Sequence, residues 1–87
     1  MQRDAKESIP EWEEVAAVAC SVQNMWLTTT AHNIGAYWSS PGYIRDIGPF
    51  LQLKENERCL GFFYMGHHKT PKIPRNRQPI TDKVEWI

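Results

Sequence analysis

Apolar residues between positions 9 and 32 recur at helical intervals and predict one long helix. They lie three or four residues apart along one stripe, and this spacing places side chains on a single face of an α-helix. We therefore expect a helix over Ile9–His32, followed by Asn33, which tolerates the left-handed conformation common after a helix. The stripe comprises Trp12, Val15, Ala19, Val22 and Trp26.

The beginning of this helix carries two agreeing sequence signals. Ser8 and Glu11 have the spacing of a capping box, in which both side chains accept hydrogen bonds from free backbone N–H groups. Pro10 suits a first helical turn, because its missing N–H would have no partner there. Residues 1–8 are polar, and we expect them to be disordered.

The second half of the chain is less regular. Residues 39–42 predict a turn, and residues 43–53 predict a short helix that is interrupted at Gly48-Pro49. Residues 59–66 are apolar at successive positions, so they predict a strand covered on both faces, as in the centre of a sheet. The basic, Pro-rich segment 67–78 is expected to be extended.

The end of the chain alternates apolar and polar residues over Val84–Ile87. This pattern is typical of a strand added to a sheet or of a segment docked on a neighbour. The long helix is apolar on nearly all sides and needs more cover than 87 residues provide. One strand and one helix also do not complete a domain. We therefore expect a partner subunit or further sequence.

Charge and cysteine content exclude several classes of protein. Ten basic and ten acidic residues cancel and form no basic stripe, so nucleic-acid binding is not expected. No apolar run has the length of a membrane span, so no membrane partner is expected. Cys20 and Cys59 are read most simply as buried free thiols of a cytoplasmic protein, although their spacing leaves a disulfide open. The His and Cys residues lack metal-ligand spacing, and no metal site is expected.

The segment after the helix carries the candidate chemistry. Trp38, Ser39 and Ser40 combine an aromatic ring with two hydroxyls at the predicted turn. Such a turn suits a flat cofactor with polar edges, because the indole can stack on its ring while the hydroxyls meet its heteroatoms. The alternative is that Trp38 packs in the core and the serines only shape the turn.

Three segments, taken in order, resemble a known family. They are VQNMWLTTTAHNIGAYWSSPG, ERCLGFFYMG and RQPITDKVEWI. Together they are similar to the C-terminal half of the FMN-dependent nitroreductase family, from about Glu11 to Ile87. The resemblance implies an α+β, nitroreductase-like fold, here a partial one with a long central helix, a strand and an extended C-terminal tail. Residues 1–87 would then be the C-terminal portion of a single domain.

The same resemblance implies a homodimer that binds FMN at the subunit interface. FMN would take a hydride from NAD(P)H and pass electrons to a nitro, quinone or enone acceptor, and because the cofactor carries this chemistry no catalytic residue is expected. The residues implied to bind FMN are Trp38, Ser39, Ser40 and, at the phosphate, Arg77, with Arg75 and Lys72 as less favoured substitutes. The residues implied to lie where NAD(P)H approaches are Thr28, Thr29, Thr30, Ala31, His32 and Asn33.

Two alternatives stay open beside this interpretation. The hydroxyls of Thr28–Thr30 have a plainer role available, since threonines within a helix often hydrogen bond to preceding carbonyls. The Arg-rich opening motif of the family has no counterpart in Met1-Gln2-Arg3, so the chain is expected to be incomplete as an enzyme. The alternative function is a non-catalytic oligomerisation module, or an inactive remnant that binds no cofactor.

Overall fold

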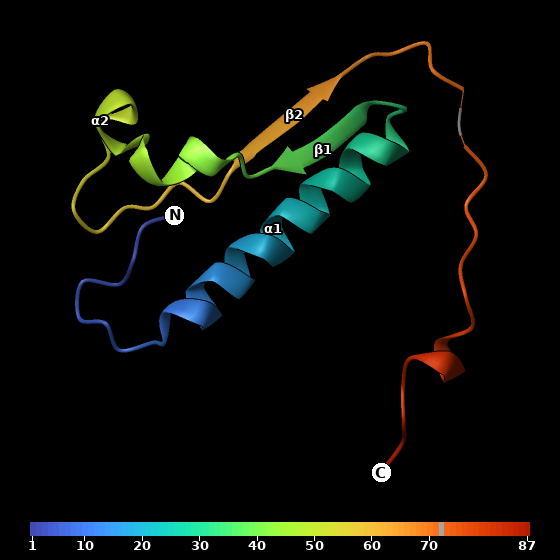
Figure 1. The fold of residues 1–87 in the computed structure, drawn as a ribbon, viewed down its shortest axis with the longest axis horizontal. Helices are drawn as coiled ribbons and strands as arrows, with labels where there is room; N and C mark the ends of the chain where they lie inside the picture. The colour runs from blue at the N-terminus through green and yellow to red at the C-terminus, as the bar shows by residue number, and fades with distance from the viewer. Residues whose placement is uncertain (72) are drawn as a thin grey trace.

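The computed structural model describes residues 1–71 and 73–87, and Lys72 lies outside this part of the chain. Its elements are the helix α1 (Glu11–Ala31), the strand β1 (Gly35–Ser39), the 3₁₀ helix η1 (Gly42–Asp46), the helix α2 (Gly48–Leu51), the strand β2 (Phe62–Gly66) and the 3₁₀ helix η2 (Ile80–Asp82). The two strands lie alongside α1 and form an antiparallel pair (Figure 1). A helix on a small antiparallel sheet is a mixed helix-and-sheet arrangement, as expected.

The long helix was predicted correctly, with ends that differ by one or two residues. It begins at Glu11 rather than Ile9 and ends at Ala31 rather than His32. The predicted capping box is wrong, since no side chain caps the first turn. The hydroxyl of Ser8 instead donates a hydrogen bond to the carboxylate of Asp4. The Ser8 side chain is therefore engaged within residues 1–8 rather than at the first turn of the helix.

Residues 1–8, for which the sequence predicts disorder, make specific contacts in the structure. Gln2 pairs with Glu57 in an antiparallel bridge, which ties the start of the chain to the loop before β2. Arg3 donates from Nε to Glu14 Oε2 at 2.8 Å, and both side chains are largely buried. This charge-assisted hydrogen bond favours one position of the polar segment against the helix. We call residues 1–4 the N-terminal strap.

The pKa values of two carboxylates, Asp4 in the N-terminal strap and Glu14 on α1, lie below their ordinary values. The hydrogen bond from Arg3 is the main reason that the pKa of Glu14 is lowered, and the backbone N–H of Asp4 adds a second donor at 2.8 Å. The hydrogen bond from the Ser8 hydroxyl is the main reason that the pKa of Asp4 is lowered. Both shifts arise because donors stabilise the ionised carboxylate.

The sheet differs from the prediction of a central strand. The predicted strand over residues 59–66 is confined to Phe62–Gly66, and its one strand partner in residues 1–71 and 73–87 is β1. The register places Trp38 opposite Phe63, so both side chains lie on one face of the sheet. Trp26 of α1 meets Phe63 edge to face, with ring centroids 6.0 Å apart. This face therefore packs against the helix.

The other face of the sheet carries a stacked tyrosine pair. Tyr37 and Tyr64 lie opposite each other, with ring centroids 5.1 Å apart and more than two fifths of each residue exposed. The prediction that residues 59–66 are covered on both faces is therefore wrong for this structure. Residues 59–66 are apolar at successive positions because Tyr64 pairs with Tyr37 across the sheet, and not because other elements cover both faces.

The remaining C-terminal half follows the prediction in outline. The expected interrupted helix is present as η1 and α2, with Pro49 in the first turn of α2. After β2 the chain leaves the sheet and passes along the far side of α1 toward the C-terminus (Figure 1). The sequence predicts that Val84–Ile87 either adds a strand to the sheet or docks on a neighbour. The structure has no strand there.

The chain buries little of its apolar surface. Its radius of gyration is 17.0 Å, whereas about 12 Å is usual for a compact domain of this length. Val22 is the one hydrophobic residue in the described ranges that is buried, while Trp12 of the helix stripe is 69% exposed. The expectation of buried thiols fails for Cys20, which is exposed, and both cysteines are free. Among the described helices, none is both long and apolar enough to span a bilayer.

Candidate functional site

The C-terminal end of α1 turns the chain sharply into β1. Asn33 adopts the left-handed conformation predicted for it, with φ of 58°. Its N–H donates to the carbonyl of Thr30 at 3.1 Å, and the N–H of Ile34 donates to the carbonyl of Thr29 at 2.8 Å. These two bonds make a Schellman motif, which satisfies the last helix carbonyls. The strand can therefore begin at Gly35 and return along the helix.

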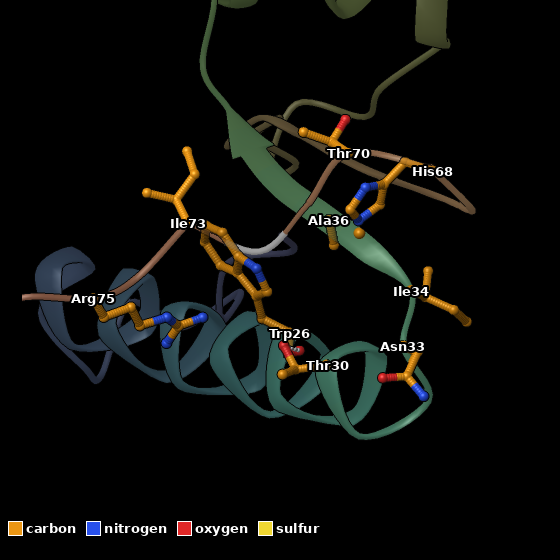
Figure 2. Close-up of a pocket in the computed structure, with 10 residues that line it drawn as sticks. Trp26, Thr30, Asn33, Ile34, Ala36, His68, Thr70, Ile73 and Arg75 are labelled. Atoms are coloured by element: carbon orange, nitrogen blue, oxygen red, sulfur yellow. Dashed lines mark hydrogen bonds between the residues drawn. The ribbon is translucent and has the colours of Figure 1, made fainter.

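This turn helps to enclose a hollow of about 710 Å³, which we call the Trp26 hollow. It lies between the last turns of α1, the first residues of β1 and the segment after β2. In Figure 2 the Trp26 indole stands up from α1, with Ile73 and Arg75 on one side and His68 on the other. The volume is in the range of small-molecule and cofactor sites. The polar side chains that line it are Thr30, Asn33, His68, Thr70 and Arg75.

A second, mostly apolar hollow also borders the end of α1. It has a volume of about 480 Å³, and we call it the Met25 hollow. Ile34 lines both hollows, because it lies at the junction of helix and strand. The other residues of the Met25 hollow are Ser21, Asn24, Met25, Thr28, Thr29, His32 and Met65.

The residues predicted to meet NAD(P)H are divided between the two hollows. Thr28, Thr29 and His32 line the Met25 hollow, whereas Thr30 and Asn33 line the Trp26 hollow. Ala31 lines neither of them. The structure thus brings five of the six residues to cavities, but to two separate ones. Their contact with NAD(P)H stays a prediction.

The three threonine hydroxyls also have the plainer role that the sequence left open. Thr28 donates to the carbonyl of Asn24 at 2.8 Å. Thr29 and Thr30 both donate to the carbonyl of Trp26, at 2.7 and 3.1 Å. Each hydroxyl proton is therefore used within the helix. Their oxygens keep lone pairs, so these side chains can offer acceptors to a ligand.

The structure does not place Trp38 and Ser39 in a turn. Both belong to β1, and the turn begins after them, so that part of the prediction is wrong. The Trp38 indole covers Gly61, where a β-carbon would collide with it. Ser40 donates from its hydroxyl to the carbonyl of Leu60 at 3.0 Å. Aromatic residues favour extended backbone, which explains the strand that the sequence reading missed.

Trp38, Ser39 and Ser40 line neither hollow. The indole and the Ser40 hydroxyl hold β1 against the segment that leads into β2. Direct contact of these residues with FMN stays a prediction.

The two arginines of the tail differ in position. Both residues are exposed, but Arg75 lines the Trp26 hollow together with Thr30, whereas Arg77 lines neither hollow. Lys72, the other substitute considered from the sequence, lies outside the described residues. Arg75 is thus the tail arginine that the structure brings to a cavity.

Trp26 and His68 are cavity residues that sequence reasoning did not select. Trp26 was assigned only to the apolar stripe of the helix, because its spacing fits that stripe. From the sequence, His68 enters only as a possible metal ligand. In residues 1–71 and 73–87, no group of three His, Cys, Asp or Glu side chains could hold a metal ion. No signal in the sequence joins His68 to the helix end, since that contact depends on the strand pairing.

The site is a hollow of cofactor size at the junction of a helix and a small antiparallel sheet. Comparison with protein families matches residues 1–67 to the Nitroreductase family, and the chain belongs to this family. The resemblance stated from the sequence is thereby confirmed for most of its length, and membership indicates an oxidoreductase. No curated protein and no solved structure matches the chain.

Proposed function

We propose that the chain forms part of an FMN-dependent oxidoreductase of the nitroreductase type, which passes electrons from NAD(P)H to nitro, quinone or enone acceptors. The observation that carries this proposal is the Trp26 hollow, which lies where the family-matched helix and strand meet. Its volume and mixed polar and aromatic lining suit a planar cofactor. The protein's task at such a site is to bind and orient the cofactor and to control access to it.

The residues of the Trp26 hollow fit the chemistry of FMN, which joins a planar heteroaromatic ring to a phosphate. The Trp26 indole offers a flat surface for the ring. The guanidinium of Arg75 offers the planar, charged donors that suit a phosphate. The amide of Asn33 offers both donors and an acceptor to ring heteroatoms. We therefore propose Arg75 as the phosphate contact. The contact of Arg77 with the phosphate, which the family resemblance implies, is the competing assignment.

The Met25 hollow is the proposed place where the nicotinamide of NAD(P)H or the acceptor approaches. Met25, Ile34 and Met65 give it an apolar lining. His32 and the acceptor oxygens of Thr28 and Thr29 provide the polar contacts. Because Ile34 borders both hollows, a ligand in one lies close to a ligand in the other.

A second copy of the chain is part of the same proposal. Leu27 is 58% exposed and Phe50 is 84% exposed, and a partner that covered such side chains would remove apolar area from water. We propose a homodimer in which the partner and any further segment of the protein close the open sides of the Trp26 hollow. The free thiols of Cys20 and Cys59 agree with a cytoplasmic location.

The first experiment tests cofactor binding and the choice of arginine. The purified chain is titrated with FMN and with riboflavin, which lacks the phosphate, while flavin and Trp fluorescence are followed. Arg75→Gln is expected to weaken FMN binding about tenfold, since a hydrogen bond to a charged group is lost, and to leave riboflavin binding unchanged. Arg77→Gln is the matched control, because Arg77 lies outside the hollow.

Three results would speak against this assignment. Equal losses in the two arginine variants would remove the special role of Arg75. A loss confined to Arg77→Gln would restore the assignment implied by the family resemblance. A folded chain that binds neither flavin, alone or in its oligomer, would favour the oligomerisation module, for which the exposed apolar side chains of α1 are the supporting observation.

A further inference from the structure

The imidazole of His68 lies against the backbone of Gly35, at the end of the Trp26 hollow where α1 joins β1. A β-carbon on Gly35 would collide with this ring and would lie 2.7 Å from its Nε2. The next nearest atom, the carbonyl oxygen of Gly66, would be at 3.5 Å, which is an ordinary contact. The missing side chain of Gly35 therefore makes a notch that the His68 ring fills.

The backbone itself does not require glycine at this notch. In the described ranges, the glycine with a positive φ is Gly61, and Gly35 is a strand residue paired with Gly66. An alanine is compatible with strand backbone, so its β-carbon would conflict with His68 alone. The absence of a side chain at Gly35 thus serves to let the His68 imidazole approach the backbone closely.

We propose that His68 is a ligand-positioning residue, whose imidazole is held by the Gly35 notch and hydrogen bonds to the polar edge of the flavin ring. This inference rests on the proposed function. His68 lines the same hollow as Trp26 and Asn33, and an imidazole can donate or accept a hydrogen bond. Figure 2 shows it on the opposite side of the Trp26 indole from Arg75, so its contact is with the ring rather than with the phosphate.

The test compares three variants of the full chain: His68→Ala, Gly35→Ala and the double variant. FMN and riboflavin are titrated into each of them. His68→Ala is expected to weaken both flavins by the same factor, about fivefold, because one hydrogen bond to the shared ring is lost. Gly35→Ala is expected to match it, since the new β-carbon displaces the imidazole. The double variant is expected to bind no more weakly than His68→Ala, because the group that the β-carbon displaces is already gone.

Gly66→Ala serves as the matched control, since a β-carbon there meets nothing within 4 Å. It is expected to bind both flavins as the wild type does. Far-UV circular dichroism and the urea midpoint establish that each variant is folded. The imidazole resonances of His68 in NMR spectra report the notch directly, and Gly35→Ala is expected to shift them without any flavin present.

The outcomes separate this inference from the proposed function. A wild-type chain that binds neither flavin would overturn the proposed function and the ring contact together. Flavin binding in the wild type with unmoved His68 resonances in Gly35→Ala would overturn the notch alone. Losses that multiply in the double variant, or a loss confined to FMN, would overturn the ring contact while leaving the proposed function intact.

Discussion

The two ends of β1 use similar residues for different purposes. At the Ser39 end, the Trp38 indole covers Gly61 and the Ser40 hydroxyl is bound to a backbone carbonyl. At the Gly35 end, the groups that line the Trp26 hollow face a cavity. Each end also has a glycine that admits an aromatic ring, and the rings belong to Trp38 and His68. The aromatic and hydroxyl motif that stands out in the sequence lies at the end where contacts are internal.

This contrast teaches that residue type does not reveal whether a polar or aromatic group is free to bind a ligand. Ser40 and Asn33 are both polar residues beside a turn. The hydroxyl proton of Ser40 is used by Leu60, while the Asn33 side chain borders a cavity. The difference comes from where each residue falls relative to the pairing of β1 with β2. We therefore expect substitutions at the Ser39 end to change stability, and substitutions at the Gly35 end to change flavin binding.

The largest effect is expected for Gly61→Ala. Gly61 has φ of 141°, a conformation that side chains rarely adopt, and a β-carbon there would also lie 2.6 Å from the carbonyl oxygen of Ser39. Strain and collision with backbone together should lower the free energy of unfolding by about 3 kcal/mol. Urea unfolding followed by circular dichroism measures this loss. Gly66→Ala is the control, and equal midpoints for the two variants would show that the Ser39 end is not tightly packed.

The next effect is expected for Trp38→Ala. The indole is half-buried over Gly61, so its removal should lower the free energy of unfolding by about 2 kcal/mol, less than for a fully buried tryptophan. Flavin affinity is measured at a temperature where the variant is folded. If the indole only packs within the protein, this affinity should change less than threefold, whereas a lost contact worth about 1.4 kcal/mol would change it tenfold. A loss of tenfold or more with unchanged stability would restore the direct contact with FMN that the family resemblance implies.

The contrast between the two ends also explains what the sequence could and could not predict. The helix was predictable because twenty or so residues of regular spacing outweigh any single local signal. The left-handed Asn33 was predictable because few residues other than glycine tolerate that conformation. Both are local properties of the chain.

The missed features depend on residues that are far apart in the sequence. Trp38 reaches Gly61, and His68 reaches Gly35, only because β1 and β2 pair in one particular register. A shift of one residue would turn Trp38 to the other face of the sheet. Likewise, the ion pair of Arg3 with Glu14 joins residues 1–8 to the helix, and composition does not predict it. The candidate site was therefore predictable in its helix half and not in its strand and tail half.

The smallest effect is expected at the N-terminal strap, which provides a reference away from both ends of β1. The pKa of Glu14 lies below its ordinary value of 4.5, so the stability that it contributes is complete above that pH and is lost as the pH falls through the lowered value. Glu14→Gln should lower stability at neutral pH by less than Trp38→Ala does, because the amide keeps the shape and one acceptor oxygen. It should also flatten the pH dependence of the free energy of unfolding below pH 4.5. The slope that remains comes from Asp4, whose pKa is lowered from 3.8.

Urea midpoints between neutral pH and strongly acidic pH measure both effects. Flavin affinity at neutral pH is expected to stay unchanged. A variant that kept the wild-type slope would mean that the carboxylate of Glu14 is not held by Arg3, and a variant that lost flavin binding would mean that the strap reaches the site.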